Sequence, residues 1–282
     1  MADKLPILST VRDAYAFVWR YRRRFFSLAF PAVVILSIPN AFVLLAPKLA
    51  GGDEGWALLL SGKTFVGLVS ILAVVEIAFY VMFSVAWHRR YLVPGEAMTV
   101  REALRWRRRQ TGFLLRFLAL SALMLLVWLI TAGVFALYYS ANPAESGIQG
   151  SLALVSGIFA PVVILTSYLY ARLLPLLPAT AVDHRMSFRA CFELTRGNGW
   201  RLVFIIAVVG IPIWIFSGIA QVANIPLFAT GTLSGSLVAA LVGETLTFIG
   251  IAVGVSALSI AYERLMAGGG RGQAGHPLEP VH

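Results

Sequence analysis

Two glutamates lie within long apolar stretches of the chain. An acid in such a stretch is the first candidate for a chemical role. Glu76 and Glu244 stand at the same distance from the start of their stretches. An ionised carboxylate inside hydrocarbon costs about 3 kcal/mol or more, so it is by default a functional candidate. The pair predicts a proton relay or a cation site. The alternative is structural: each acid is held neutral by a hydrogen bond to a neighbouring helix, or pairs with Arg116 or Arg172.

Other groups that carry chemistry form weaker patterns. Asp183-His184-Arg185 is a candidate for acid/base work, but a polar triplet in a loop is more often solvated. The single cysteine, Cys191, excludes an intramolecular disulfide and a cysteine-cluster metal site, and we expect it to be a buried structural thiol. The histidines do not stand at metal-ligand spacing, and they are His88, His184, His276 and His282.

Sequence motifs of the common enzyme classes are also missing. The chain contains no nucleophile elbow, Walker loop, HExxH or dinucleotide fingerprint. We therefore predict that the protein is not an enzyme, with no catalytic residues, no metal and no cofactor.

The composition shows that these residues belong to a membrane protein and not to a water-soluble one. Of 282 residues, 59% are hydrophobic and 13% are charged, and the mean hydropathy is +0.82. Soluble domains carry about 25% charge, so a water-soluble globular protein is excluded. The net charge of +10 would suggest nucleic acid in a soluble protein. Here, contact with anionic lipid explains it, and we predict no nucleic-acid partner.

Six apolar stretches are long enough to cross about 30 Å of hydrocarbon. They predict an all-α integral membrane protein with six transmembrane helices, at 25–47, 64–87, 112–139, 151–174, 202–225 and 232–262. Of the 23 Lys and Arg residues, all but Lys48 and Lys63 fall on one side of these stretches. By the positive-inside rule, both termini are expected in the cytoplasm, with the protein in a bacterial inner (plasma) membrane.

Three segments of the chain begin alike and predict an internal repeat. They start at Thr10, Thr99 and Ser187, hydroxyl residues suited to cap a helix, and in the first two an acid follows three residues later, as in a capping box. Each unit is expected to be a cytoplasmic amphipathic helix followed by a helical hairpin. The units span about 9–93, 98–178 and 186–266 of a single membrane domain, 1–266. The stretch 267–282 is expected to be a disordered cytoplasmic tail.

The three amphipathic helices run into basic stretches that together predict a basic cytoplasmic collar. Arg12, Arg101 and Arg189 fall at the same repeat position. An arginine fork binds phosphate at two points, so these residues could hold lipid headgroups or a partner. The alternative is that the collar only anchors and orients the spans. The candidate lipid- or partner-binding residues are Arg12, Arg101, Arg189, Arg107, Arg108 and Arg196.

One segment resembles a motif of known membrane proteins. Residues 187–201 read SFRACFELTRGNGWR, and Tyr262, Glu263 and Arg264 follow near the end of the last span. This pattern is similar to one that recurs in bacterial six-span inner-membrane proteins, including the membrane domain of glycerophosphoryl diester phosphodiesterases. The resemblance implies a multi-pass membrane domain that is not itself the catalyst. This chain departs from the phosphodiesterases because no soluble catalytic domain is seen, so their activity is not carried over.

Two functions of different classes follow from these patterns. The preferred one is non-enzymatic: a membrane-organising or accessory subunit that binds anionic lipid, a protein partner or a second copy of itself through the basic collar. The alternative is a small transporter or lipid carrier that uses Glu76 and Glu244. A cavity that reaches either glutamate favours the carrier, and a closed, dry bundle favours the accessory role.

Overall fold

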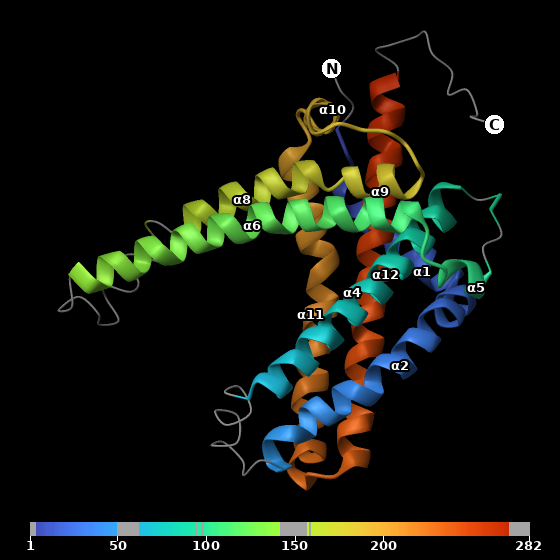
Figure 1. The fold of residues 1–282 in the computed structure, drawn as a ribbon. Coiled ribbons are helices and arrows are strands. Elements are labelled where there is room, and N and C mark those ends of the chain that lie inside the picture. The colour runs from blue at the N-terminus through green and yellow to red at the C-terminus, as the bar shows by residue number, and fades with distance from the viewer. Residues whose placement is uncertain are drawn as a thin grey trace.

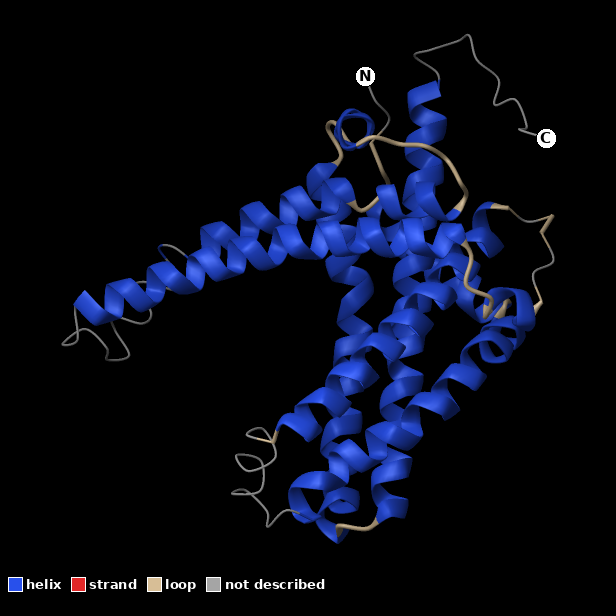
Figure 2. Ribbon diagram, in the orientation of Figure 1, coloured by secondary structure: helices blue, strands red, loops and turns tan. Residues whose placement is uncertain are grey.

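The computed structural model describes residues 4–49, 62–93, 95–96, 99–141, 157 and 159–270. These residues form helices and loops without a strand (Figure 2). The helices are α1 (Ile7–Arg20), α2 (Arg22–Leu49), α4 (Lys63–Leu92), α5 (Val100–Ala103), α6 (Arg108–Ala141), α8 (Ala160–Leu173), α9 (Leu176–Ala181), α10 (Phe188–Leu194), α11 (Gly199–Thr230) and α12 (Leu233–Gly270).

Six of these helical segments are long and apolar enough to cross a membrane, which confirms the prediction of six spans. They run over Arg22–Ala46, Phe65–Leu92, Arg108–Tyr138, Ala160–Ala181, Gly199–Asn224 and Leu233–Gly268. The chain is a multi-pass membrane protein. The fourth segment continues past Leu174 through Pro175 into α9, and its predicted start at Ser151 lies outside the described residues.

The last helix extends further than the sequence predicts. Helix α12 reaches Gly270, so residues 267–270 are helical and their assignment to a disordered tail is wrong. The preceding turns pack on the bundle, with Leu265 buried, and the packed helix carries the glycines that follow, with no proline to end it before Pro277. The remainder of the predicted tail, 271–282, lies outside the described residues.

A short helix precedes each pair of long ones along the chain, but the three helix starts differ. Thr99 caps α5 in a capping box with Glu102, as predicted, and the Ser187 hydroxyl accepts a hydrogen bond from the Ala190 amide at the start of α10. The prediction for Thr10 is wrong. Helix α1 begins after Pro6, and Thr10 is buried inside it with its hydroxyl bonded to the Pro6 carbonyl. The short helices also differ in length, with 14, 4 and 7 residues.

The long helices are arranged unequally. Helices α2, α4, α11 and α12 form one bundle, whereas α6 and α8 run side by side away from it as a separate hairpin (Figure 1). The hairpin docks through residues near the start of α6, where Phe113 and Leu120 are buried against α4 and α9. Farther along α6, Leu125, Leu129 and Leu137 are exposed. Large apolar side chains exposed on a spanning helix face lipid.

The core is concentrated where the short helices meet the bundle, at what we call the basic end, defined by α1, α5, α9 and α10. An aromatic cluster joins α2, α4 and α12 there, with Phe25, Phe83, Trp87 and Phe248 in contact. Trp87 is fully buried, and its indole N–H donates to the Ser256 hydroxyl at 2.9 Å. That bond satisfies a donor that would otherwise be stranded in an apolar environment.

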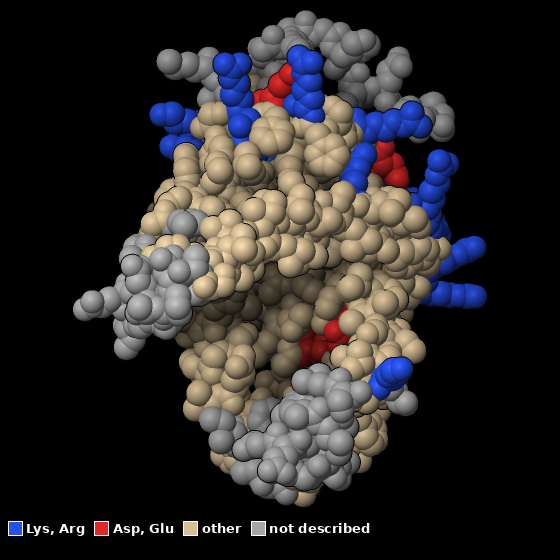
Figure 3. Space-filling view, turned by 60° about the vertical axis from the view of Figure 1, so that its left-hand side comes forward, with Lys and Arg blue, Asp and Glu red and all other residues tan. Residues whose placement is uncertain are grey.

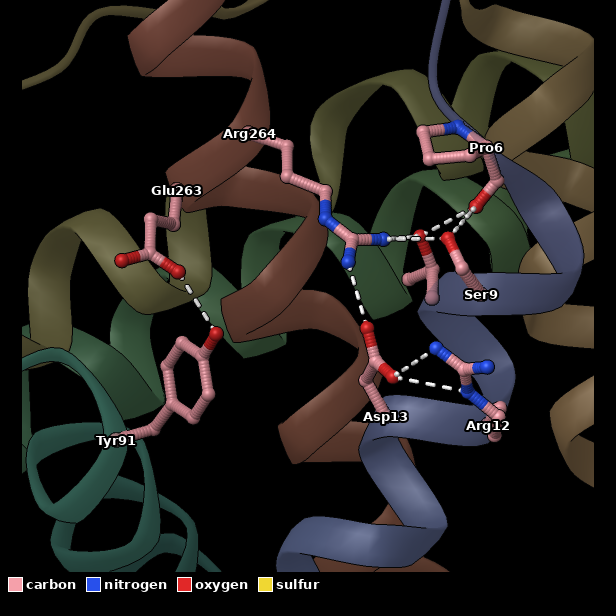
Figure 4. A network of polar contacts seen from close by, with 8 residues as sticks. Pro6, Ser9, Arg12, Asp13, Tyr91, Glu263 and Arg264 are labelled. Carbon is pink, nitrogen blue, oxygen red and sulfur yellow. Dashed lines mark hydrogen bonds and ion pairs between the residues drawn. The ribbon is translucent and has the colours of Figure 1, made fainter.

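A network of polar contacts fastens α1 to α12 (Figure 4). Arg264 donates to the hydroxyls of Ser9 and Thr10, at 3.2 and 2.6 Å, and to the Asp13 carboxylate at 2.7 Å. Burial of Asp13 raises the pKa of its carboxyl group. The hydrogen bonds from Arg264 and Arg12 outweigh that effect and hold the pKa below its usual 3.8. Asp13 therefore holds α1 against α12 instead of completing a capping box with Thr10.

Replacing Arg264 with alanine should loosen α1. Charge-assisted hydrogen bonds contribute about 1–3 kcal/mol each, so amide hydrogen exchange over residues 7–20 should speed up markedly. Arg12→Ala is the control, because Arg12 is 78% exposed and an exposed pair contributes about 0–1 kcal/mol. Since the pKa of Asp13 is lowered, the contact is present above pH 3.8 and is lost as pH falls through the folded-state pKa below it. Equal exchange in both variants would contradict this assignment.

Candidate functional site

The two intramembrane acids meet at one amide. Both hydrogens of the Asn40 side-chain amide are used: Nδ2 donates to Oε1 of Glu76 at 2.7 Å and to Oε1 of Glu244 at 2.8 Å. The distance between the two Oε1 atoms is therefore at most the sum of these two hydrogen-bond lengths. The predicted pair is brought together, on α4 and α12, by a residue of α2 that the sequence analysis did not single out.

Tyr80 completes the cluster from the next turn of α4. Its hydroxyl donates to Oε2 of Glu244 at 3.3 Å, so both oxygens of Glu244 accept a hydrogen bond. Residues four apart on a helix share a face, which explains why Glu76, bonded to Asn40, and Tyr80, bonded to Glu244, belong to one network. We call Asn40, Glu76, Tyr80 and Glu244 the carboxyl cluster.

The carboxyl cluster lies deep within the apolar part of the molecule. With a rise of about 1.5 Å per residue, Asn40, Glu76 and Glu244 stand about 14–20 Å from the helix ends opposite the basic end. Glu244 is only 8% exposed. In the part of the chain that the structure describes, neither acid forms an ion pair with Lys or Arg. The acids are therefore satisfied by neutral donors alone.

A cavity of about 370 Å³ with both polar and apolar walls, which we call the polar cavity, reaches the carboxyl cluster from the α2, α11 and α12 side. Asn40 and Glu244 both line it. Its wall also carries side chains that can donate and accept hydrogen bonds, namely Ser217, Gln221, Asn224 and Thr247. These polar residues belong to α11 and α12 and line the cavity beside Glu244.

A second, larger cavity lies on the other side of Tyr80. It has a volume of about 590 Å³, is open on one side, and is lined by residues of α4, α6, α8, α9, α11 and α12, with mainly apolar walls. Tyr80 lines this cavity and bonds Glu244, which lines the polar one. The molecule is hollowed beside the α6–α8 hairpin, and acidic atoms show in the wall of the hollow (Figure 3). The carboxyl cluster thus stands between two cavities.

The arginines offered as alternative partners of the acids are engaged elsewhere. Arg116 bonds the Thr180 hydroxyl on α9, and Arg172 donates to the Phe192 carbonyl at 2.5 Å. Arg172 also lies over the ring of Phe192, 4.5 Å from its centroid. The alternative in which Glu76 or Glu244 pairs with Arg116 or Arg172 is therefore wrong.

The arginines of the predicted collar lie exposed at the basic end, where Lys and Arg side chains gather in Figure 3. Two of the three repeat-equivalent arginines pair with acids of their own helices: Arg12 with Asp13 at 3.2 Å and Arg189 with Glu193 at 3.0 Å. These pairs are local and solvated, and each lies within the helix that carries its arginine. The exposed set is Arg12, Arg101, Arg107, Arg108, Arg189 and Arg196.

The loop triplet that begins at Asp183 has structural partners. Asp183 accepts from Arg89 at 3.1 Å and lies 3.7 Å from Arg109, which ties the loop after α9 to α4 and α6. His184 contacts the Tyr262 hydroxyl through Nδ1 at 2.6 Å. These contacts hold the basic end together and leave no free acid/base pair. Among the described residues, no group of three or more His, Cys, Asp and Glu side chains could hold a metal ion.

The segment that resembles a known motif is explained by packing. Gly197 adopts a positive φ of 79°, which favours glycine, and a Cβ on Gly199 would collide with the ring of Tyr168. Buried Asn198 accepts a hydrogen bond from the Leu5 amide at 2.9 Å, which fixes the chain before α1. This glycine-rich turn therefore allows α10, α8 and the N-terminal segment to meet.

Cys191 is buried on α10, as predicted, with its thiol 3.2 Å from the Arg172 carbonyl. Burial raises the pKa of this thiol to about 12. Because the thiolate is the reactive form, iodoacetamide at pH 8 should leave the folded protein unmodified and label it only after unfolding, as read by intact mass. Rapid labelling of the folded chain would show that α10 opens.

Comparison with protein-family models, curated proteins and solved structures finds no match for this chain. Its function is therefore argued from the carboxyl cluster and the cavities.

Proposed function

We propose that this protein is a membrane carrier that binds a proton or a cationic group at Glu76 and Glu244. The observation that carries the proposal is the carboxyl cluster itself: two acids share one amide donor between two cavities, without a basic partner among the residues that the structure describes. A cavity that reaches a buried carboxyl group distinguishes a carrier from a dry, purely structural bundle. The role needs no catalytic residue, no metal and no cofactor.

Electrostatics explains how the carboxyl cluster would work. Two neighbouring carboxylates in a poorly polar medium repel each other and are each poorly solvated. Either a shared proton or a bound cation relieves that repulsion. Asn40 holds both acids in place in either case, because its amide donates to each of them. Binding of a cationic group and release of a proton are therefore coupled at this site.

A membrane-permeant, hydrophobic carbodiimide tests this proposal. A protonated carboxyl group adds to the reagent and rearranges to a stable N-acylurea, which mass spectrometry locates on the peptide. In membranes, we expect the reagent to modify Glu76 or Glu244, and to do so faster at lower pH. In the Glu76→Gln, Glu244→Gln double variant, neither position should be modified. Acids at the basic end, such as Glu102, should stay unmodified because they lie in water. Acids that react only after unfolding would contradict the proposal.

A docking role for the basic end is the second candidate function. The supporting observation is the exposed arginine set, with Trp19, Trp106 and Trp200 exposed on the same segments. Basic and aromatic side chains together suit a membrane interface rich in anionic lipid. We propose that this end faces the cytoplasm of a bacterial inner membrane. Vesicle binding that falls steeply with salt, and that a six-arginine variant loses, supports docking; unchanged binding opposes it.

A further inference from the structure

The two cavities follow one another along a single seam between α11 and α12. On α12, Gly243 and Thr247 line the polar cavity and Gly250 and Gly254 line the apolar one. These positions recur every three or four residues and so share one face of the helix. On α11, Ser217 and Gln221 continue the face that carries Gly210 and Trp214 in the same way. The seam is therefore polar in one half and apolar in the other.

This division matches the shape of a lipid-like molecule. The apolar half extends toward the basic end, from Gly250 to Ala261 on α12, over about 16 Å. The polar half lies toward the opposite end, and Asn40 and Glu244 of the carboxyl cluster line it. A cavity of about 590 Å³ lies within the usual range for small-molecule sites, about 300–1,000 Å³. A molecule with its headgroup at Glu244 would point its chain toward the basic end, as a lipid of the leaflet opposite that end does.

The surroundings of the seam favour one kind of headgroup and one route. The acids lack a basic partner among the described residues, so a positively charged headgroup supplies the missing charge. The α6–α8 hairpin leaves the bundle on the side of the apolar cavity, which Phe113 and Phe117 of α6 line. A chain can therefore enter sideways from the bilayer, without crossing the basic end.

We propose that the carrier takes a single-chain amphiphile with a cationic headgroup, such as a long-chain amine. The amine binds at the carboxyl cluster and the hydrocarbon chain fills the apolar cavity along the α11–α12 seam. This inference rests on the proposed function, since it names the substrate class of the same acids.

Photolabelling with hexadecylamine that carries a diazirine in its chain tests the inference in lipid nanodiscs. We expect the label on residues that line the apolar cavity, and competition by unlabelled hexadecylamine. Butylamine, which has the cation without the chain, and hexadecanoic acid, which has the chain without the cation, should compete at least about tenfold less well.

Two matched glycine variants separate binding in the cavity from adsorption to lipid-facing helices. A Cβ on Gly254 or on Gly218 meets no other heavy atom within 4 Å, so a larger side chain can begin at both positions without a clash. Gly254 lines the apolar cavity, whereas Gly218 lies exposed on α11 and lines neither cavity. Gly254→Leu should reduce specific labelling at least about tenfold, as should Glu244→Gln, and Gly218→Leu should label as wild type.

The outcomes distinguish a wrong substrate class from a wrong function. Labelling that Gly254→Leu leaves unchanged, or equal competition by hexadecanoic acid, overturns the amphiphile. If the carbodiimide still modifies the acids in that case, the proton or cation site stands and only its substrate class is wrong. If the carbodiimide fails to modify wild type as well, the proposed function falls with it.

Discussion

Replacing Asn40 with leucine should lower the free energy of unfolding by about 3–5 kcal/mol. Leucine is close in size but removes both N–H donors, so Glu76 loses its bond from Asn40 and Glu244 keeps only the bond from Tyr80. Acids without donors in the membrane interior are expensive, and here two acids each lose a donor at once. Thermal unfolding in a mild detergent, followed by circular dichroism, measures the loss as a drop in Tm.

A double-mutant cycle shows whether that loss of stability arises from the contacts of the carboxyl cluster. Adding Glu244→Gln to Asn40→Leu should restore part of the stability, with a coupling of about 0.5–3 kcal/mol, because one charge is gone. Asn224→Leu is the matched control: Asn224 lines the same cavity but donates to neither acid. Additive effects of the two changes, or an equal loss in the control, would contradict a cluster held by Asn40.

A cysteine at position 217 should react at least about a hundredfold faster with a charged, impermeant methanethiosulfonate than a cysteine at position 218. Ser217 lines the polar cavity and Gly218 faces outward on the same helix, so the two thiols differ only in their surroundings. Thiolates form in water and not in hydrocarbon, which makes the rate a measure of solvation. The native Cys191 does not interfere, because its pKa is raised to about 12.

The side from which the Ser217→Cys variant reacts also tests the orientation of the protein. If the basic end is cytoplasmic, reagent added outside intact cells should modify position 217, since the polar cavity lies toward the opposite end. Protection by hexadecylamine would link this cavity to the proposed substrate. Equal, slow rates at 217 and 218 would mean that the cavity holds no water, which removes the support for a carrier.

Several features of this fold follow from local sequence. Six spans are set by the length of apolar runs, because each backbone polar group in hydrocarbon must be satisfied within its own helix. The Thr99 capping box is set by two residues three apart. At Thr10 the same pattern fails, because Pro6 starts the helix earlier and Arg264, far along the chain, takes Asp13 as its partner.

The candidate site also contains residues that could be predicted from sequence and an arrangement that could not. Glu76 and Glu244 could be selected from sequence, since an acid inside an apolar span is costly wherever its partners lie. Asn40 could have been selected by a weaker form of that argument, as an amide inside the first span. Their meeting could not be predicted, because it depends on how α2, α4 and α12 pack. Gly250 and Gly254 stand four apart, a spacing typical of a helix contact, yet of the two only Gly250 is close to α11, through Ile213, and Gly254 faces open space.

Native mass spectrometry of the full chain, extracted gently from its own membranes, shows directly what the protein carries. We expect a bound small amphiphile with a basic headgroup, one per chain, which Glu244→Gln loses and Gly218→Leu retains. A protein subunit at fixed stoichiometry, held equally well by the Glu76→Gln, Glu244→Gln double variant and lost on replacing the exposed arginines, would contradict the carrier and identify an accessory protein instead.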